Sequence, residues 1–132
     1  MTAAVIDASA LVLALIGRER RAVALRRDIP GTHLHAPHLV DAECANVLRR
    51  HERGGQITPL EAAIGLEVGA VLVRHRYPHT GPVAARAWEL RDNLSFYDAL
   101  YVALAELLDV PLWTADARIA RAPNVSCEVR VV

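Results

Sequence analysis

Short apolar runs alternate along the chain with longer segments in which apolar residues recur at helical spacing. The first kind of run is typical of buried strands and the second of amphipathic helices. The runs predict strands at residues 3–6, 32–36, 76–78, 110–114 and 127–131. The helical spacing predicts helices at residues 9–15, 18–28, 38–53, 58–73, 82–90, 95–108 and 116–121. This alternation predicts an α/β fold. We expect a three-layer α/β/α sandwich around a mostly parallel sheet of about five strands, in a single domain covering residues 1–132.

Polar residues at the element boundaries support this assignment. Thr58 stands at the start of a helix with the spacing of a capping box, and Ser95 is placed to cap another. In the helix at 18–28 we expect Ala22, Val23 and Leu25 to face inward. The boundaries therefore agree with the apolar pattern.

Four acidic residues stand where folding alone explains an acid poorly. Asp7 and Asp116 each follow a predicted strand, and ligands of open α/β sheets bind beyond the carboxyl ends of the strands. The cap at Ser95 puts Asp98 in the first turn of its helix, near the same edge. Glu43 interrupts an apolar helix stretch after the second strand. The four carboxylates are therefore expected to meet at one end of the sheet.

A cluster of this kind is costly, because like charges repel and burial disfavours ionisation. A divalent metal ion offsets that cost, and oxygen-rich sites favour magnesium or manganese. Each acid also has a structural explanation. Asp7 and Asp116 are suited to cap helices, Asp98 to oppose a helix dipole, and Glu43 to point into solvent. The four positions together favour a functional site, because all four acids are expected at the same edge of the sheet.

Composition and charge show whether nucleic-acid binding is compatible with this chain. The chain has 132 residues, 53% of them hydrophobic, and a net charge of zero. All fifteen basic residues are arginine, five of them between residues 18 and 27 and three between 49 and 53. Arginine binds phosphate through a planar fork, so these groups are compatible with RNA binding, although a solvated helix face is the better explanation of any single group.

Targeting signals are not evident in the sequence. No apolar stretch approaches the roughly 20 residues of a membrane span. The start, from Met1 to Asp7, lacks the basic region of a signal peptide. We therefore expect a cytoplasmic protein that does not interact with membranes, and we expect Cys44 and Cys127 to stay reduced there.

Two further groups suggest metal or thiol chemistry but are weak. His33, His35 and His38 invite a zinc assignment, yet we do not expect their side chains to share one face. Cys44, beside Glu43, is expected to be a buried packing residue and not a nucleophile.

Four blocks of sequence resemble a known family. They read DASAL at residues 7–11, ECANVL at 43–48, SFYDALYVALA at 95–105 and LWTAD at 112–116. In this order and at this spacing they resemble the PIN domain, and most closely the VapC toxins of prokaryotic toxin–antitoxin pairs. The resemblance covers essentially the whole chain.

The resemblance implies a magnesium- or manganese-dependent endoribonuclease, usually a homodimer, that a cognate VapB-type antitoxin inhibits. It matches the family's acidic positions with Asp7, Glu43, Asp98 and Asp116. It matches supporting polar positions, less closely, with Ser9, Asn46 and Thr114.

Magnesium usually keeps several waters and binds one or two carboxylates. We therefore expect Asp7 and Asp98 to be the most direct ligands. Glu43 is expected to act as a ligand or as the base for the attacking water, and Asp116 to hold a second metal or to act through water.

Partner surfaces are also expected. The apolar excess fits a homodimer, and we expect the helix at 58–73 and the segment at 78–88 to contribute to it. An antitoxin is expected to cover the acidic groove with an apolar helix and to place a basic side chain against the carboxylates, in competition with metal.

Three other protein classes share some of these features. Phosphoacceptor receiver domains need a lysine near the last strand, and this chain has none. Haloacid-dehalogenase-type phosphatases need Asp-x-Asp after the first strand, whereas here the residues are Asp7, Ala8 and Ser9. A PIN-like fold that only binds another protein is the remaining alternative. The intact set of four acids counts against it.

Overall fold

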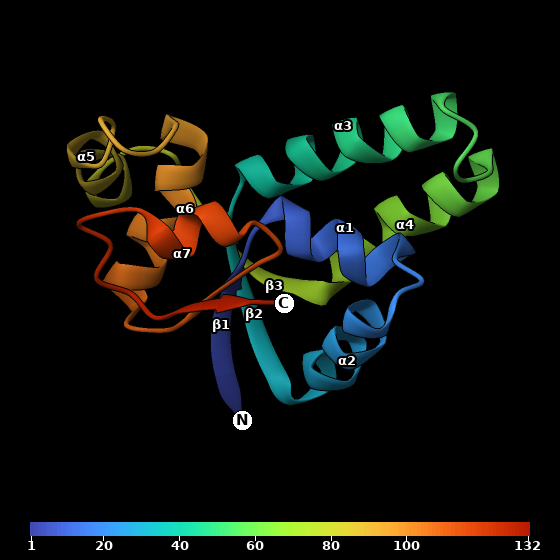
Figure 1. Ribbon diagram of the computed structural model, residues 1–132, viewed down its shortest axis with the longest axis horizontal. Coiled ribbons are helices and arrows are strands. Elements are labelled where there is room, and N and C mark those ends of the chain that lie inside the picture. Colours follow the sequence, from blue (N-terminus) through green and yellow to red (C-terminus); the bar gives the residue numbers. More distant parts are fainter.

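A sheet of five parallel strands forms the centre of the molecule (Figure 1). The computed structural model describes all residues from 1 to 132. The strand order is β3–β2–β1–β4–β5, and every neighbouring pair is parallel. The strands are β1 (Thr2–Ile6), β2 (Thr32–Pro37), β3 (Val73–Tyr77), β4 (Leu112–Thr114) and β5 (Val129–Val131). The chain builds outward from β1 to β3 and then returns to the other side of β1. The strand order therefore reverses between β1 and β4, where an open α/β sheet forms its binding crevice.

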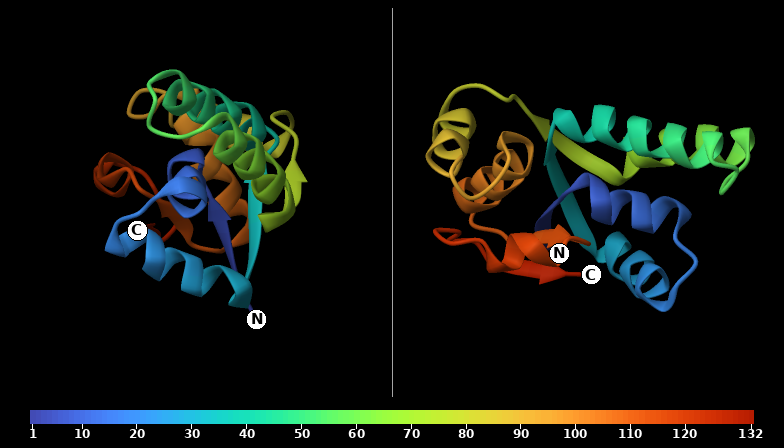
Figure 2. Two further views of the ribbon diagram at one scale, coloured as in Figure 1. Left: turned by 90° about the vertical axis from the view of Figure 1, so that its right-hand side faces the viewer. Right: turned by 45° about the horizontal axis from the view of Figure 1, so that its top comes forward.

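Helices cover both faces of this sheet. They are α1 (Ala8–Ile16), α2 (Arg20–Asp28), α3 (Leu39–Arg53), α4 (Pro59–Leu72), α5 (Pro82–Glu89), α6 (Phe96–Leu108) and α7 (Ala117–Arg121), with a 3₁₀ turn at Ile29–Gly31. Figure 2 shows α1 to α4 grouped on one side of the strands and α5 with α6 on the other. The predicted α/β/α sandwich is confirmed. None of the helices combines the length and the apolar character needed to cross a membrane.

The core lies on both sides of the two central strands. Val5 and Ile6 of β1 and Leu112 of β4 are fully buried, as expected for parallel strands covered on both faces. Helix α6 is apolar on nearly all sides and buries every residue from 99 to 105. Its first turn is thereby fixed at the carboxyl edge of the sheet.

The element boundaries differ from the sequence prediction in places. β3 begins at Val73, earlier than predicted, because this edge strand carries exposed Arg74 and His75 that hide the apolar pattern. β4 and β5 are each two residues shorter at their start than predicted. The expectation that Val23 faces inward was wrong, since only Ala22 and Leu25 of α2 are buried.

Candidate active site

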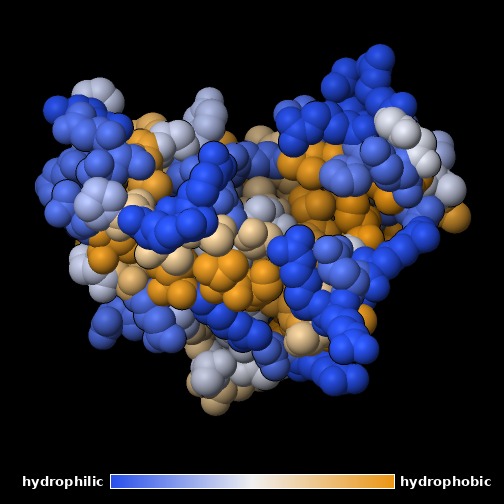
Figure 3. Space-filling view, in the orientation of Figure 1, coloured by the Kyte–Doolittle hydropathy of each residue, from blue (hydrophilic) through white to orange (hydrophobic).

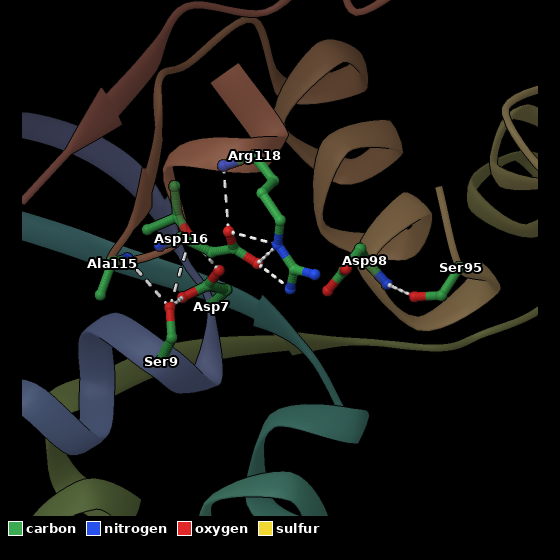
Figure 4. A network of polar contacts seen from close by, with 8 residues as sticks. Asp7, Ser9, Ser95, Asp98, Ala115, Asp116 and Arg118 are labelled. Atoms are coloured by element: carbon green, nitrogen blue, oxygen red, sulfur yellow. Dashed lines mark hydrogen bonds and ion pairs between the residues drawn. The ribbon is translucent and has the colours of Figure 1, made fainter. Parts of the chain in front are cut away.

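The carboxyl edge of the sheet carries the four acidic residues singled out by the sequence. Asp7 directly follows β1 and caps α1, and Asp116 follows β4 and caps α7. Asp98 lies in the first turn of α6, and Glu43 in the second turn of α3. Figure 4 shows the three aspartates facing the same region. Asp7 and Asp116 therefore cap helices, as one explanation predicted, and their carboxylates also belong to the acidic cluster.

Asp7 is held by three hydrogen bonds. Its Oδ1 accepts from the Ser9 hydroxyl at 2.6 Å and from the Ala10 N–H at 2.9 Å. Its Oδ2 accepts from the Thr114 hydroxyl at 2.5 Å. Asp7 is 4% exposed, so these bonds fix a buried carboxylate in one orientation.

Ser9 and Thr114 also tie the ends of β1 and β4 together. The Ala115 N–H donates to the Ser9 hydroxyl oxygen at 2.9 Å (Figure 4). The Asp116 N–H donates to the Thr114 hydroxyl oxygen at 3.0 Å. The two supporting hydroxyls therefore position the site from both strands. Asn46, the third predicted supporting residue, is exposed on α3, and no hydrogen bond joins it to the acids.

Tyr101 contacts the acidic cluster, and the sequence analysis did not single it out. It is buried in α6, and its hydroxyl donates to Glu43 Oε1 at 2.5 Å. This bond joins α6 to α3 and leaves Glu43 Oε2 free. A sequence signal existed, because Tyr101 lies three residues after Asp98, on the same side of the helix.

Burial and mutual repulsion raise the pKa of three of the carboxyl groups. Desolvation is the main cause for Asp7, Glu43 and Asp98. Repulsion by a neighbouring acid adds to each: Asp98 acts on Asp7 and on Glu43, and Asp116 acts on Asp98. This coupling indicates that the four groups share one electrostatic site.

Asp116 differs from the other three because a guanidinium neutralises it. Its hydrogen bond to the Arg118 side chain lowers the pKa of Asp116. Arg118 Nε lies 3.0 Å from Oδ1, and Nη2 lies 2.7 Å from Oδ2. Arg118 was not among the residues predicted from the sequence, although its position two residues after Asp116 is the signal that it pairs locally.

The donor set suits a hard cation. It consists of carboxylate and hydroxyl oxygens, which magnesium and manganese prefer. Burial raises the pKa of the Cys44 thiol to about 12, so that neighbour of Glu43 is not a thiolate ligand. No three acidic, histidine or cysteine side chains converge at metal-binding positions in this conformation. Arg118 engages both oxygens of Asp116 in this conformation.

The histidines of the sheet lie apart from this site. His33 and His35 are two residues apart in β2, so they share a face, and the expectation that they do not was wrong. The His75 ring of β3 stacks on His35 with centroids 4.8 Å apart. His38 instead lies beside His79. None of these histidines belongs to a group arranged to hold a metal ion.

A parallel five-stranded sheet with acids at its switch point defines an α/β domain with a candidate cation site. Within that class the chain belongs to the PIN-domain family, whose model matches residues 4–125. The chain is 44% identical over 132 residues to Ribonuclease VapC1 of Mycobacterium tuberculosis. The aligned residues cover 100% of this chain and 99% of that protein. It is 42% identical over 130 residues to Ribonuclease VapC9 of the same species, covering 97% of each. These relatives place the chain in the VapC branch of the family.

Solved structures of low sequence identity share the fold. VapBC2 from Rickettsia felis, bound to a DNA fragment from its promoter, matches with a TM-score of 0.69 at 14% identity, over 98% of this chain and 99% of that chain. VapC20 of Mycobacterium tuberculosis, a sarcin-ricin loop cleaving toxin, matches with a TM-score of 0.68 at 16% identity, over 89% and 93%. The PIN-type architecture is therefore common to all of them.

Proposed function

We propose that this protein is a magnesium- or manganese-dependent endoribonuclease and the toxin of a toxin–antitoxin pair. The observation that carries the proposal is the set of four acids at the switch point, three of them with a raised pKa. The names of the VapC relatives, which are ribonucleases, support RNA as the substrate. The proposal includes a cytoplasmic location, where RNA is available.

Asp7 and Asp98 are the residues proposed to hold the ion most directly, with Asp116 as a further ligand or a holder of bound water. A divalent ion supplies charge neutralisation at the scissile phosphate and lowers the pKa of water. The hydrogen bonds from Ser9 and Thr114 keep the Asp7 carboxylate from rotating. Such fixed orientation is what supporting groups contribute in metal sites.

Glu43 is proposed as the base. The Tyr101 hydroxyl occupies Oε1, so Oε2 is the oxygen that takes the proton from the attacking water. Burial raises the pKa of Glu43, which brings it closer to the range in which a carboxylate accepts a proton efficiently. Attack on phosphorus breaks the bond to the leaving ribose oxygen, and no protein nucleophile is required.

The antitoxin is proposed to bind α4 as well as the acids. Large apolar side chains are exposed along this helix, namely Leu60, Ile64, Leu66, Val68 and Val71. A groove of about 580 Å³ runs beside it against α1 and the end of α2. Figure 3 shows hydrophobic surface in this hollow, with hydrophilic residues around it. The solved VapBC complexes support a partner of this kind, and a groove of this shape suits an amphipathic helix.

A homodimer is also part of the proposal. Trp88 of α5 and Tyr97, in the first turn of α6, are large exposed aromatic residues. Aromatic residues are enriched at protein interfaces, so this surface is the one we assign to the second copy. Sedimentation that shows only monomer at high micromolar concentration would remove this part of the proposal.

The test of the activity is cleavage of end-labelled single-stranded RNA by the purified protein. Cleavage should require Mg²⁺ or Mn²⁺ and stop with excess EDTA, then return when metal is restored. Undiminished cleavage in EDTA would overturn metal dependence. Binding of a partner protein by a chain that neither cleaves RNA nor takes up metal would instead favour a non-catalytic binding module.

A further inference from the structure

Arg118 holds the Asp116 carboxylate from three positions. Its backbone N–H donates to Oδ1 at 3.0 Å, its Nε lies 3.0 Å from Oδ1, and its Nη2 lies 2.7 Å from Oδ2. One residue therefore caps α7 with its backbone and neutralises the same acid with its side chain. Both oxygens that Asp116 would offer to a cation are already engaged.

The guanidinium also faces a second acid. Figure 4 shows it between the carboxylates of Asp116 and Asp98. The charges of Arg118 and Asp98 attract each other across this gap. A positive group of the chain thus stands between two of the four acids proposed to hold the metal ion.

This arrangement can open at low cost. The Arg118 side chain is 84% exposed, and Asp116 is its only hydrogen-bonded partner. An exposed ion pair of this kind contributes little to stability, because water and salt screen it. A divalent ion that binds Asp98 and Asp116 would repel the guanidinium and replace it.

We propose that Arg118 is a positioning residue with two alternative partners, the acids of the candidate metal site and a phosphate of bound RNA. The proposal rests on the function proposed above. In the metal-free protein Arg118 neutralises Asp116 and screens Asp98. When a divalent ion occupies the site, the arginine is released toward solvent and binds an RNA phosphate next to the one that is cut.

The chemistry of the side chain supports the second partner. A guanidinium binds carboxylate and phosphate through the same planar fork, so one group can exchange between them. The exchange links metal binding to RNA binding, because the ion frees a cationic group for the substrate. The paired arginine also makes the acidic cluster less repellent to RNA than four carboxylates without a cationic partner would be.

The first experiment measures metal affinity without any reaction. Mn²⁺ is titrated into the protein, and free Mn²⁺ is followed by electron paramagnetic resonance. Arg118→Gln should bind Mn²⁺ about 2- to 5-fold more tightly than the unmodified protein, because an exposed competing ion pair is removed. Arg121→Gln is the matched control, since it removes the same charge from α7 without a hydrogen bond to Asp116, and it should change affinity less.

The second experiment measures RNA affinity by fluorescence anisotropy, with and without metal. Ca²⁺ replaces Mg²⁺ so that the labelled single-stranded RNA stays intact during the measurement. Arg118→Gln should weaken RNA binding several-fold in Ca²⁺ and have little effect in EDTA, because the arginine is then held by the acids. Arg118→Lys, which keeps the charge without the fork, should restore part of the loss.

The outcomes separate this inference from the function on which it rests. If the unmodified protein binds Mn²⁺ and cleaves RNA but Arg118→Gln binds Mn²⁺ no more tightly, the exchange is wrong and the proposed function stands. An RNA-binding loss that is equal in Ca²⁺ and EDTA would also overturn the exchange, since Arg118 would then be an ordinary phosphate contact. If the unmodified protein takes up no Mn²⁺, both fall together.

Discussion

The acidic edge of the sheet and the outer face of α4 both depart from the usual pattern of exposed charged residues and buried apolar residues. They depart from it in opposite ways. At the acidic edge a carboxylate is buried, with Asp7 only 4% exposed. On α4 apolar side chains are exposed, with Leu60 at 69% and Val71 at 78%. Charged groups are rarely buried without partners, and clusters of exposed apolar side chains mark interaction surfaces.

The difference teaches what each region lacks. No buried side-chain nitrogen or oxygen lacks a hydrogen-bond partner. Repulsion between neighbouring acids nevertheless contributes to the raised pKa of Asp7, Glu43 and Asp98. On α4 the inner face is closely packed, because a Cβ at Gly65 would lie 3.3 Å from Leu48 and one at Gly69 would lie 3.3 Å from Leu15. The inner face of α4 is therefore packed closely against its neighbours, while its outer face is exposed to solvent. We therefore propose a cation for the first region and an apolar partner for the second.

Among the variants, Asp98→Asn should show the largest difference between its effect on RNA cleavage at the acidic edge and its effect on partner binding at α4. Loss of a proposed ligand should reduce RNA cleavage by about 100-fold or more, because charge neutralisation at the phosphate is lost. Binding of a partner through the α4 groove should stay within a few-fold. Cleavage assays paired with circular dichroism check this, and activity close to that of the unmodified protein would exclude Asp98 from the site.

Ile64→Asp tests the other region. Ile64 lines the groove and is half exposed, so the change should leave the fold intact and weaken an antitoxin-type partner about 30-fold, as for an interface hot spot. Ala63→Asp, exposed on the same helix outside the groove, is the control. Isothermal titration with a VapB-type antitoxin that binds the unmodified protein measures both. Equal weakening by the two variants would show that charge on α4, and not the groove, matters.

Tyr101→Phe should have a smaller effect on cleavage. The ring stays in the core while Glu43 loses its hydrogen bond, so activity should fall about tenfold, as for outer-shell groups of metal sites. The lost bond normally lowers the pKa of Glu43, so the acid limb of the pH–rate profile should move to higher pH. A uniform loss at every pH would point to a packing defect instead.

The pH dependence of stability should show the smallest effect. Asp7, Glu43 and Asp98 have a folded pKa above the unfolded one, so the folded state binds more protons and stability falls as pH rises through that window. The stability of the Asp7→Asn protein relative to the unmodified protein should therefore increase as pH rises from about 4 to 7 in EDTA. Urea unfolding at several pH values measures the gap. A gap that shrinks as pH rises would contradict the assignment.

Much of this fold could be predicted because its elements follow local rules. The capping box at Thr58 and the cap at Ser95 are present as predicted, and the central strands are apolar runs covered on both faces. β3 was harder, because an edge strand with exposed Arg74 lacks such a run. The ends of α4 and β3 follow tertiary contacts that periodicity does not encode.

The position of the four acids could be predicted from the sheet edge, whereas their partners could not. Asp7 and Asp116 follow strands, which fixes them at the carboxyl edge. The Tyr101 bond to Glu43 joins residues 58 positions apart and depends on how α6 crosses α3. Arg118 sits beside its acid, but only the structure shows that it also faces Asp98. The metal ligands themselves stay a prediction.

Thermal unfolding with and without Mg²⁺ tests most directly whether the acidic edge is a cation site. A ligand that binds only the folded state raises the melting temperature. At neutral pH in EDTA, the Asp7→Asn protein should melt above the unmodified protein, because one buried charge is removed. Saturating Mg²⁺ should raise the melting temperature of the unmodified protein and leave that of Asp7→Asn nearly unchanged, so the gap closes or reverses. An equal response of the two proteins, or none in either, would contradict the account.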